Sequence, residues 1–180
     1  MTNHIDLGTV LRQTLSANLF SNLVTRPTGA AVRSQIELML HPDERSLTII
    51  DFSHVSMIDF SCADEVIAKL LLRTPSEREA YFVFRGVTDD HWDAIEAVLE
   101  RHGLALVVER ESGVEIMGVL DDHERRVFDA IKHRGRAECR QLAVDLRESE
   151  SVVRSALEDM WRRRLIMRVG DAYAPVGELA

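Results

Sequence analysis

The Ser61 hydroxyl has the sequence surroundings that best suit covalent chemistry. It stands where an apolar run ends in a polar turn and an amphipathic helix begins. The spacing predicts that Ser61 is the N-cap of this helix and that Asp64 completes a capping box. Unpaired backbone N–H groups and the positive end of the helix dipole would then stabilise an added anion. A plain structural cap, worth about 1 kcal/mol, is the alternative interpretation.

The remaining polar residues form no set with a catalytic role. Asp51 and Asp59 flank the same turn and suggest a magnesium-assisted acceptor site, but acidic residues at strand ends are common turn formers. No glycine-rich phosphate loop accompanies them. The histidines have no HxxxH spacing; they include His54, His91, His102, His123 and His133. The sequence therefore predicts no enzymatic activity, no metal site and no cofactor.

The two cysteines, Cys62 and Cys139, lie far apart without CxxC spacing, which favours reduced thiols over a disulfide or a zinc site. Cys62 adjoins the predicted helix N-terminus, where a lowered thiol pKa would permit redox chemistry. Packing against the sheet as a small apolar residue is the preferred interpretation.

The segment around Ser61 resembles STAS domains, in which partner kinases phosphorylate a serine or threonine at a helix start. Residues 58–61 (IDFS) occupy the place of the phosphoacceptor motif. The match is closer to the divergent STAS-like family, through the helix opening SCADE at 61–65 and the strand end IDFSHV at 50–55.

This resemblance implies an α/β fold with a mixed sheet and helices, and a bacterial type of protein. It also implies Ser61 as the phosphoacceptor, with Asp59 and Asp64 at the edge of its site. An anti-sigma or kinase-like protein would be the partner. Cys62 replaces the glycine that usually follows the serine, a departure that affects kinase access and the shape of the loop.

Composition and charge describe an ordinary globular chain with an uneven charge distribution. The 180 residues are 46% hydrophobic and 29% charged, which suits one good core or two small ones. The chain has 22 Lys and Arg and 30 Asp and Glu, and 12 of each lie from Asp121 onward, leaving 10 basic and 18 acidic residues before it. An acidic surface repels phosphates, so nucleic-acid contact by the first part is not expected.

The chain shows no feature of a membrane or secreted protein. It has no window of about 18 apolar residues, and its N-terminus lacks the basic-then-apolar layout of a signal peptide. The sequence therefore predicts a cytoplasmic protein with no membrane association.

Strands and helices alternate through residues 1–120, which predicts an α/β domain with a mostly parallel sheet. Thr25, Ser61 and Thr88 are the expected starts of helices, with the first continuing through Leu40 and the third ending at Gly103. STAS domains share this arrangement. The last two strands are expected to pair as a hairpin. The predicted strands are residues 18–24, 47–52, 80–85, 104–109 and 114–119.

Residues 121–180 are predicted to form a second, small α+β domain. Helices are expected at 124–133, 138–146 and 149–164, followed by two short strands at 165–168 and 172–175. This order resembles winged helix-turn-helix domains, many of which are transcription regulators. The resemblance is carried by QLAVDL at 141–146, ESESVVRSALEDMWRRRLI at 148–166 and RVGDAYAP at 168–175.

In a DNA-bound winged helix, the third helix enters the major groove through its first turns. Arg154 is the best candidate for a base or phosphate contact. The expected core positions of this helix are Val152, Val153, Leu157 and Met160. The outward-facing DNA-contact candidates are then Ser149, Ser151, Arg154 and Ser155, with Arg140, Arg147 and Arg168 as phosphate contacts. The alternative interpretation is that these side chains are simply exposed to solvent and contact no DNA.

Two features count against DNA. Glu148 and Glu150 open the third helix, and the net charge of the second domain is near zero. The basic run at residues 162–164 lies at the far end of the helix, where it complements the dipole.

The sequence predicts a signal-responsive transcriptional regulator, in which a STAS-like receiver controls a DNA-binding winged helix. The alternative is a partner-switching protein of the anti-sigma antagonist type, whose winged helix binds protein. Sensing of a small ligand and a homodimer that matches two DNA half-sites both stay open.

Overall fold

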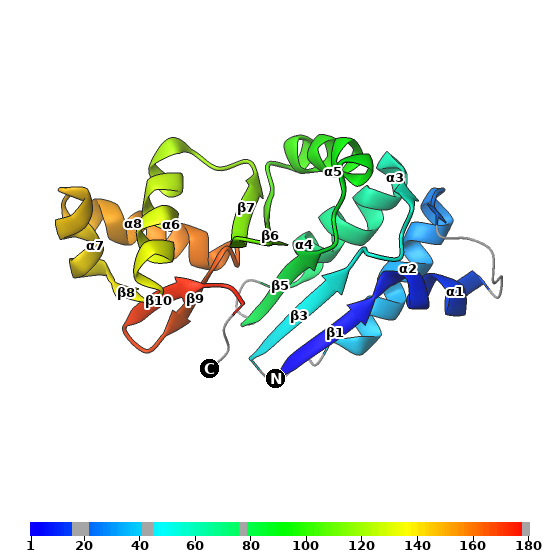
Figure 1. Ribbon diagram of the computed structural model, residues 1–180, viewed down its shortest axis with the longest axis horizontal. Coiled ribbons are helices and arrows are strands. Elements are labelled where there is room, and N and C mark those ends of the chain that lie inside the picture. Colours follow the sequence, from blue (N-terminus) through cyan, green and yellow to red (C-terminus); the bar gives the residue numbers. More distant parts are fainter. Residues whose placement is uncertain (16–21, 41–44, 76–78, 178–180) are drawn as a thin grey trace.

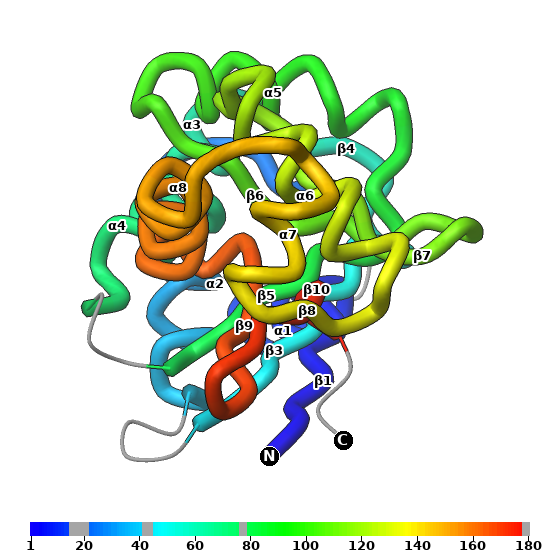
Figure 2. The backbone as a smooth tube through the Cα atoms, turned by 90° about the vertical axis from the view of Figure 1, so that its left-hand side faces the viewer, coloured from blue at the N-terminus to red at the C-terminus, as the bar shows by residue number. Residues whose placement is uncertain are grey.

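The computed structural model describes residues 1–15, 22–40, 45–75 and 79–177, which form two parts placed end to end (Figure 1). We call residues 1–120 the α/β part and residues 121–177 the C-terminal part. Figure 2 views the molecule from the C-terminal part, so that α7 and α8 lie toward the viewer and the sheet lies behind them.

The α/β part contains a five-stranded mixed sheet with the strand order β1-β3-β5-β6-β7. The first four strands are parallel, and β7 is antiparallel to β6, with which it forms a hairpin. The prediction of a mostly parallel sheet that ends in a hairpin is therefore confirmed. The strands are β1 (Thr2–Asp6), β3 (Ser46–Asp51), β5 (Ala80–Arg85), β6 (Ala105–Arg110) and β7 (Gly113–Gly118).

The edge strand β1 has no counterpart among the predicted strands. Its sequence, TNHID, is polar, and Ile5 is its only buried residue. The strand forms because its backbone pairs in parallel with β3, with Thr2 opposite Leu47. A short helix, α1 (Leu7–Leu15), follows directly.

The strand predicted at residues 18–24 is only partly visible, because residues 18–21 lie outside the described residues. Asn22–Leu23 is β2, and it pairs in parallel with β4 (Met57–Ile58). This two-stranded ribbon brings the start of the next helix beside the Ser61 turn. That helix, α2 (Arg26–Met39), ends one residue before the predicted Leu40.

Helices cover one face of the sheet. They are α2, α5 (Asp89–His102), and a continuous helix made of α3 (Phe60–Ala63), a π-helical turn η1 (Asp64–Ala68) and α4 (Lys69–Arg73). Because strand side chains alternate between the faces, Ile50, Phe82 and Leu106 point to this side and join one apolar core with the helices.

The C-terminal part, within residues 121–177, combines three helices with a small sheet of order β8-β10-β9. All three predicted helices and both predicted strands are present. Val153, Leu157 and Met160 are fully buried as predicted, but Val152 is 50% exposed and is not a core residue. The elements are α6 (Asp122–Arg134), β8 (Ala137–Glu138), α7 (Cys139–Leu146), α8 (Glu150–Arg162), β9 (Ile166–Val169) and β10 (Ala172–Pro175).

The second face of the main sheet packs against the C-terminal part. Leu47, Tyr81 and Val107 belong to the same apolar cluster as the buried residues of α6 and α8. The indole Nε1 of Trp161 also donates to the hydroxyl of Tyr81 at 3.2 Å. Parallel sheets are normally covered on both faces. Here the C-terminal part supplies the second cover, so the two parts share a core.

Candidate functional site

The turn that carries Ser61 is organised by Asp59. One carboxylate oxygen of Asp59 accepts from the Cys62 backbone N–H and from the Ser61 hydroxyl, both at 2.8 Å. The other oxygen accepts from the Thr25 backbone N–H at 3.0 Å. Asp59 is therefore the N-cap of α3, and the prediction that Ser61 is the cap is wrong. The helix begins at Phe60, directly after β4 and the extended backbone of Asp59.

The charge of Asp59 sets the environment of the Ser61 hydroxyl. Burial alone would raise the pKa of Asp59, but the N–H groups of Thr25 and Cys62 and the Ser61 hydroxyl outweigh it, so this pKa lies below its usual value. The half-buried Ser61 thus donates to an ionised carboxylate. A phosphate on Ser61 would remove this donor and place a second negative group beside Asp59.

Replacing Asp59 with alanine is expected to lower the free energy of unfolding by about 1–2 kcal/mol, because three donors lose their acceptor. Ser61→Ala removes one hydrogen bond and should cost about 0.5–1 kcal/mol. Urea denaturation of both variants at neutral pH measures the difference. A larger loss for Ser61→Ala than for Asp59→Ala would contradict the assignment of the cap.

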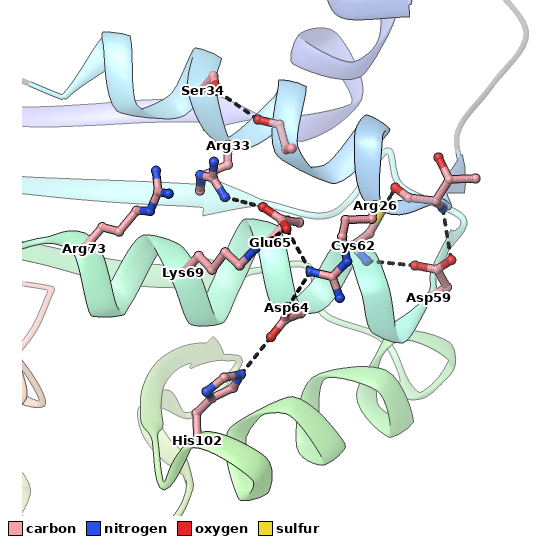
Figure 3. Close-up of polar contacts among 12 residues, drawn as sticks. Arg26, Arg33, Ser34, Asp59, Cys62, Asp64, Glu65, Lys69, Arg73 and His102 are labelled. Carbon is pink, nitrogen blue, oxygen red and sulfur yellow. Dashed lines mark hydrogen bonds and ion pairs between the residues drawn. The ribbon is translucent and has the colours of Figure 1, made fainter.

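Asp64 does not complete a capping box. Its carboxylate is buried, and it accepts from Arg26 on α2 and from His102 at the end of α5, both at 2.7 Å (Figure 3). The predicted capping box of Ser61 and Asp64 is therefore wrong, while the place of Asp64 at the edge of the Ser61 site stays a prediction. The residue instead connects three helices.

Glu65 is the centre of this buried ionic network. Its side chain is 3% exposed and accepts from Arg26 at 2.8 Å, and also from Arg33 and Lys69 (Figure 3). The Arg33 side chain is itself only 9% exposed. We call Arg26, Arg33, Asp64, Glu65, Lys69 and His102 the charge network.

Both carboxylates of the charge network are held in the ionised form. Burial alone would raise the pKa of Glu65, but hydrogen bonds from Lys69 and Arg26, with the charges of Lys69 and Arg33, hold it below its usual value. Burial likewise opposes the lowering of the Asp64 pKa, which Arg26 and His102 bring about. The network therefore joins α2 and α5 to the helix that follows Ser61.

The π-helical turn coincides with the two acids of this network. It spans Asp64–Ala68, within an otherwise α-helical segment from Phe60 to Arg73. Such single π-turns occur often at functional sites. Asp64 and Glu65, the last two of the SCADE residues that carry the STAS-like resemblance, thus lie at a local departure from regular α-helix.

Cys62 is a packing residue. It is fully buried, and its Sγ donates to the Thr25 carbonyl at 2.9 Å. Burial and the nearby charge of Asp59 raise the pKa of this thiol to about 12, which opposes thiolate chemistry. A Cβ at Gly29 would lie 2.9 Å from the Cys62 Cα, so the glycine permits α2 to cross closely here. The packing interpretation is confirmed.

Asp51 and Asp59, the two carboxylates that suggest a magnesium site in the sequence, accept hydrogen bonds from different groups. Asp51 accepts from the Ser53 backbone N–H at 2.8 Å and lies 3.3 Å from the His4 imidazole. Within residues 1–15, 22–40, 45–75 and 79–177, no group of three or more His, Cys, Asp or Glu side chains is placed to hold a metal ion.

Four of the predicted DNA-contact residues share one exposed surface. Ser149, Ser151, Arg154 and Ser155 are all exposed at the start of α8, which lies at the outer end of the molecule (Figure 1). We call these four residues the outer α8 surface.

Acidic side chains pair with the arginines near this surface. Glu150 lies 3.5 Å from Arg154 and 4.0 Å from Arg140. Glu148 lies 2.5 Å from His123 and 3.0 Å from Arg126. The acids that count against DNA binding in the sequence therefore neutralise cations of the C-terminal part.

The other two arginine candidates differ in position. Arg147 is exposed and ends α7 in a left-handed conformation, with φ of 56°. The Arg168 guanidinium lies 6.0 Å from the ring centre of Trp161, and the Arg168 carbonyl accepts from Arg45 at 2.6 Å. Trp161 is ten residues beyond Ser151, or roughly 15 Å along the helix. Arg168 therefore lies away from the outer α8 surface.

The basic run at the end of α8 fastens the two parts together, a role that sequence reasoning missed. Arg163 donates to the Val119 carbonyl of the α/β part and, within the C-terminal part, to Glu124 at 2.9 Å. The buried Arg164 donates to the Thr74 carbonyl at 2.5 Å and to the Pro75 carbonyl, just after α4. Local sequence carries no signal for these contacts, because the partners are 39 to 90 residues apart.

Comparison of the chain with models of known protein families finds no match, and neither does a comparison with curated proteins. In the described part of the chain, every helix is too short or too polar to cross a membrane. A proposed function therefore depends on the contacts around Ser61 and at the start of α8.

Proposed function

We propose that this protein is a signal-responsive transcriptional regulator, with a STAS-like receiver in the α/β part and a winged-helix DNA reader in the C-terminal part. One observation carries the proposal. Helix α8 has an exposed start with Ser149, Ser151, Arg154 and Ser155, while its other end is fastened to the α/β part through Trp161 and Arg164.

The outer α8 surface has side chains suited to a DNA groove. The three serines donate and accept hydrogen bonds, and Arg154 offers a guanidinium to a base edge or a phosphate. Glu150 competes for this guanidinium at 3.5 Å. DNA would displace an exposed ion pair of low energy, so Glu150 limits the affinity without preventing binding.

One continuous helix supports coupling between the two parts. It begins at Phe60, beside Ser61 and Asp59, and ends at Arg73, roughly 20 Å further along its axis. Arg164, which follows α8, binds the carbonyls just beyond this end. A phosphate or a docked protein at Ser61 would act on one end of the helix, and Arg164 would transmit the displacement to α8.

DNA binding is tested with Arg154→Ala. We expect a loss of affinity of about tenfold for a genomic DNA fragment selected by the wild-type protein, because one good side-chain contact to DNA contributes about 1–3 kcal/mol. Affinity should also fall as the salt concentration rises. Fluorescence anisotropy with a labelled fragment measures both effects.

Arg162→Ala is the matched control, because Arg162 is also exposed on α8 but lies two turns further along. Its affinity should stay within about twofold of the wild type, as expected for a residue outside the contact. Equal losses in both variants, or wild-type protein that selects no fragment even at low salt, would contradict the proposal.

A protein partner is the second candidate, and exposed apolar side chains favour it. Val144 on α7 is 73% exposed and Val152 on α8 is 50% exposed. Binding of an anti-sigma or kinase-like protein at this surface would be lost in the Val144→Asp variant. That binding would depend little on the salt concentration. Pull-down with the wild type and with this variant, at two salt concentrations, distinguishes it from DNA binding.

A further inference from the structure

A cleft of about 750 Å³ opens between the second face of the main sheet and the C-terminal part. Ile49 and Val114 of the sheet form part of its wall, and Val169 and Pro175 of the C-terminal part face it; all four are partly exposed. This volume lies within the range of about 300–1,000 Å³ that is common for small-molecule sites. The cleft therefore offers an apolar surface contributed by both parts of the chain.

The rim of the cleft carries excess positive charge. Lys132, near the end of α6, and Arg136, just after it, both line the cleft, and neither has a carboxylate partner within the described part of the chain. Arg136 donates a hydrogen bond to the Val169 carbonyl, at 2.9 Å. On the opposite wall, Arg85 pairs with Glu109 and is neutralised.

Glu111, Arg45 and Arg110 are the other charged residues that line the cleft. Glu111 is an exposed acid, Arg45 lies just before β3 with its Nε 3.7 Å from Glu79, and the Nε of Arg110 lies 4.0 Å from Glu115. Among the residues that the structure describes, Lys132 and Arg136 are thus two lining cations without a paired carboxylate, against one acid, Glu111, that is also unpaired. A ligand with one anionic group and an apolar body would match both the positive charge and the apolar lining.

We propose that this cleft binds a small amphipathic carboxylate. The carboxylate lies between Lys132 and Arg136, and the apolar body lies against Ile49, Val114 and Pro175. This inference goes beyond the proposed function and does not depend on DNA binding. Because both parts of the chain line the cleft, a bound ligand stabilises their observed arrangement and acts as an input separate from Ser61.

The test uses 2-naphthoate as the anionic probe and 2-naphthamide as its neutral analogue, with isothermal titration calorimetry of the full chain. We expect one equivalent of 2-naphthoate to bind, with 2-naphthamide about tenfold weaker, because it lacks the charge that Lys132 and Arg136 recognise. Lys132→Ala and Arg136→Ala should each lower the affinity for 2-naphthoate by about fivefold to tenfold and leave the affinity for 2-naphthamide almost unchanged.

Two further variants keep the result specific to the cleft. Lys132→Arg retains the charge and should bind 2-naphthoate with nearly wild-type affinity. Arg125→Ala removes an exposed cation from the same helix, outside the cleft, and should have no effect. Equal binding of the two probes by the wild type, no binding of 2-naphthoate, or an equal loss in Arg125→Ala and Lys132→Ala would overturn the proposal.

Discussion

Replacing Glu65 with glutamine is expected to lower the free energy of unfolding by about 3–5 kcal/mol, the usual cost of removing one partner from a buried ion pair. The substitution keeps the shape of the side chain and removes its charge. Arg33, whose side chain is 9% exposed, then loses its buried carboxylate partner and retains the partly exposed Glu37 carboxylate, 3.3 Å away. Since whole domains are stable by only about 5–15 kcal/mol, this is a large fraction of the total.

Glu37→Gln is the matched control for this prediction. Glu37 also contacts Arg33, at 3.3 Å, but its side chain is 33% exposed. Its removal should cost less than about 1 kcal/mol, as is typical of solvent-screened pairs. Urea denaturation followed by circular dichroism compares the two variants, and similar losses would show that Glu65 has no special role.

The same prediction has a pH dependence with a defined sign. The pKa values of Glu65 and Asp64 lie below their usual 4.5 and 3.8 in the folded protein. The ionised carboxylates therefore stabilise the fold fully above these usual values, and this stabilisation is lost as the pH falls through the lower folded-state values. The difference in stability between the wild type and Glu65→Gln should thus be constant near neutral pH and shrink in acid.

The second large effect is expected at Arg164, where methionine should lower the free energy of unfolding by about 2–4 kcal/mol. The guanidinium is buried and donates to the carbonyls of Thr74 and Pro75, which close the end of α4. Methionine retains much of the apolar stem but leaves these carbonyls without their charged donor. The positive charge also complements the negative end of the α4 dipole.

The measurement for Arg164→Met is thermal or urea unfolding, with Arg162→Met as the control on an exposed arginine two residues away. The control should stay within about 0.5 kcal/mol of the wild type. Equal stability of the two variants would mean that the contact with Thr74 and Pro75 does not hold the parts together. The coupling route from Ser61 to α8 would then lose its physical link.

Several elements could be predicted from the sequence because their signals are local. The strands β3, β5 and β6 are apolar runs bounded by polar turns, and the three C-terminal helices repeat apolar residues at helical spacing. The edge strand β1 lacks such a signal, since its single buried residue is Ile5. It forms through backbone pairing with β3, which depends on a segment more than forty residues away.

The sequence locates the turn that carries Ser61 but assigns the N-cap to the wrong residue. Asp59 and Ser61 are both good N-caps, so residue type alone does not decide which one closes the helix. The structure decides it, because β4 ends at Ile58 and leaves Asp59 in an extended conformation. The charge network around Glu65 has partners 32 and 39 residues away and was not predicted.

The amino-acid sequence determined the local elements and their order: an alternating α/β region followed by three helices and two short strands. Only the tertiary structure decided which surfaces meet. The continuous apolar runs of β3 and β5 indicate that both faces of their sheet are buried, yet they do not specify what covers the second face. The C-terminal part covers that face through the contacts of Trp161 with Tyr81 and of Arg164 with Thr74. These partners are 80 and 90 residues apart in the chain, so local periodicity does not predict them.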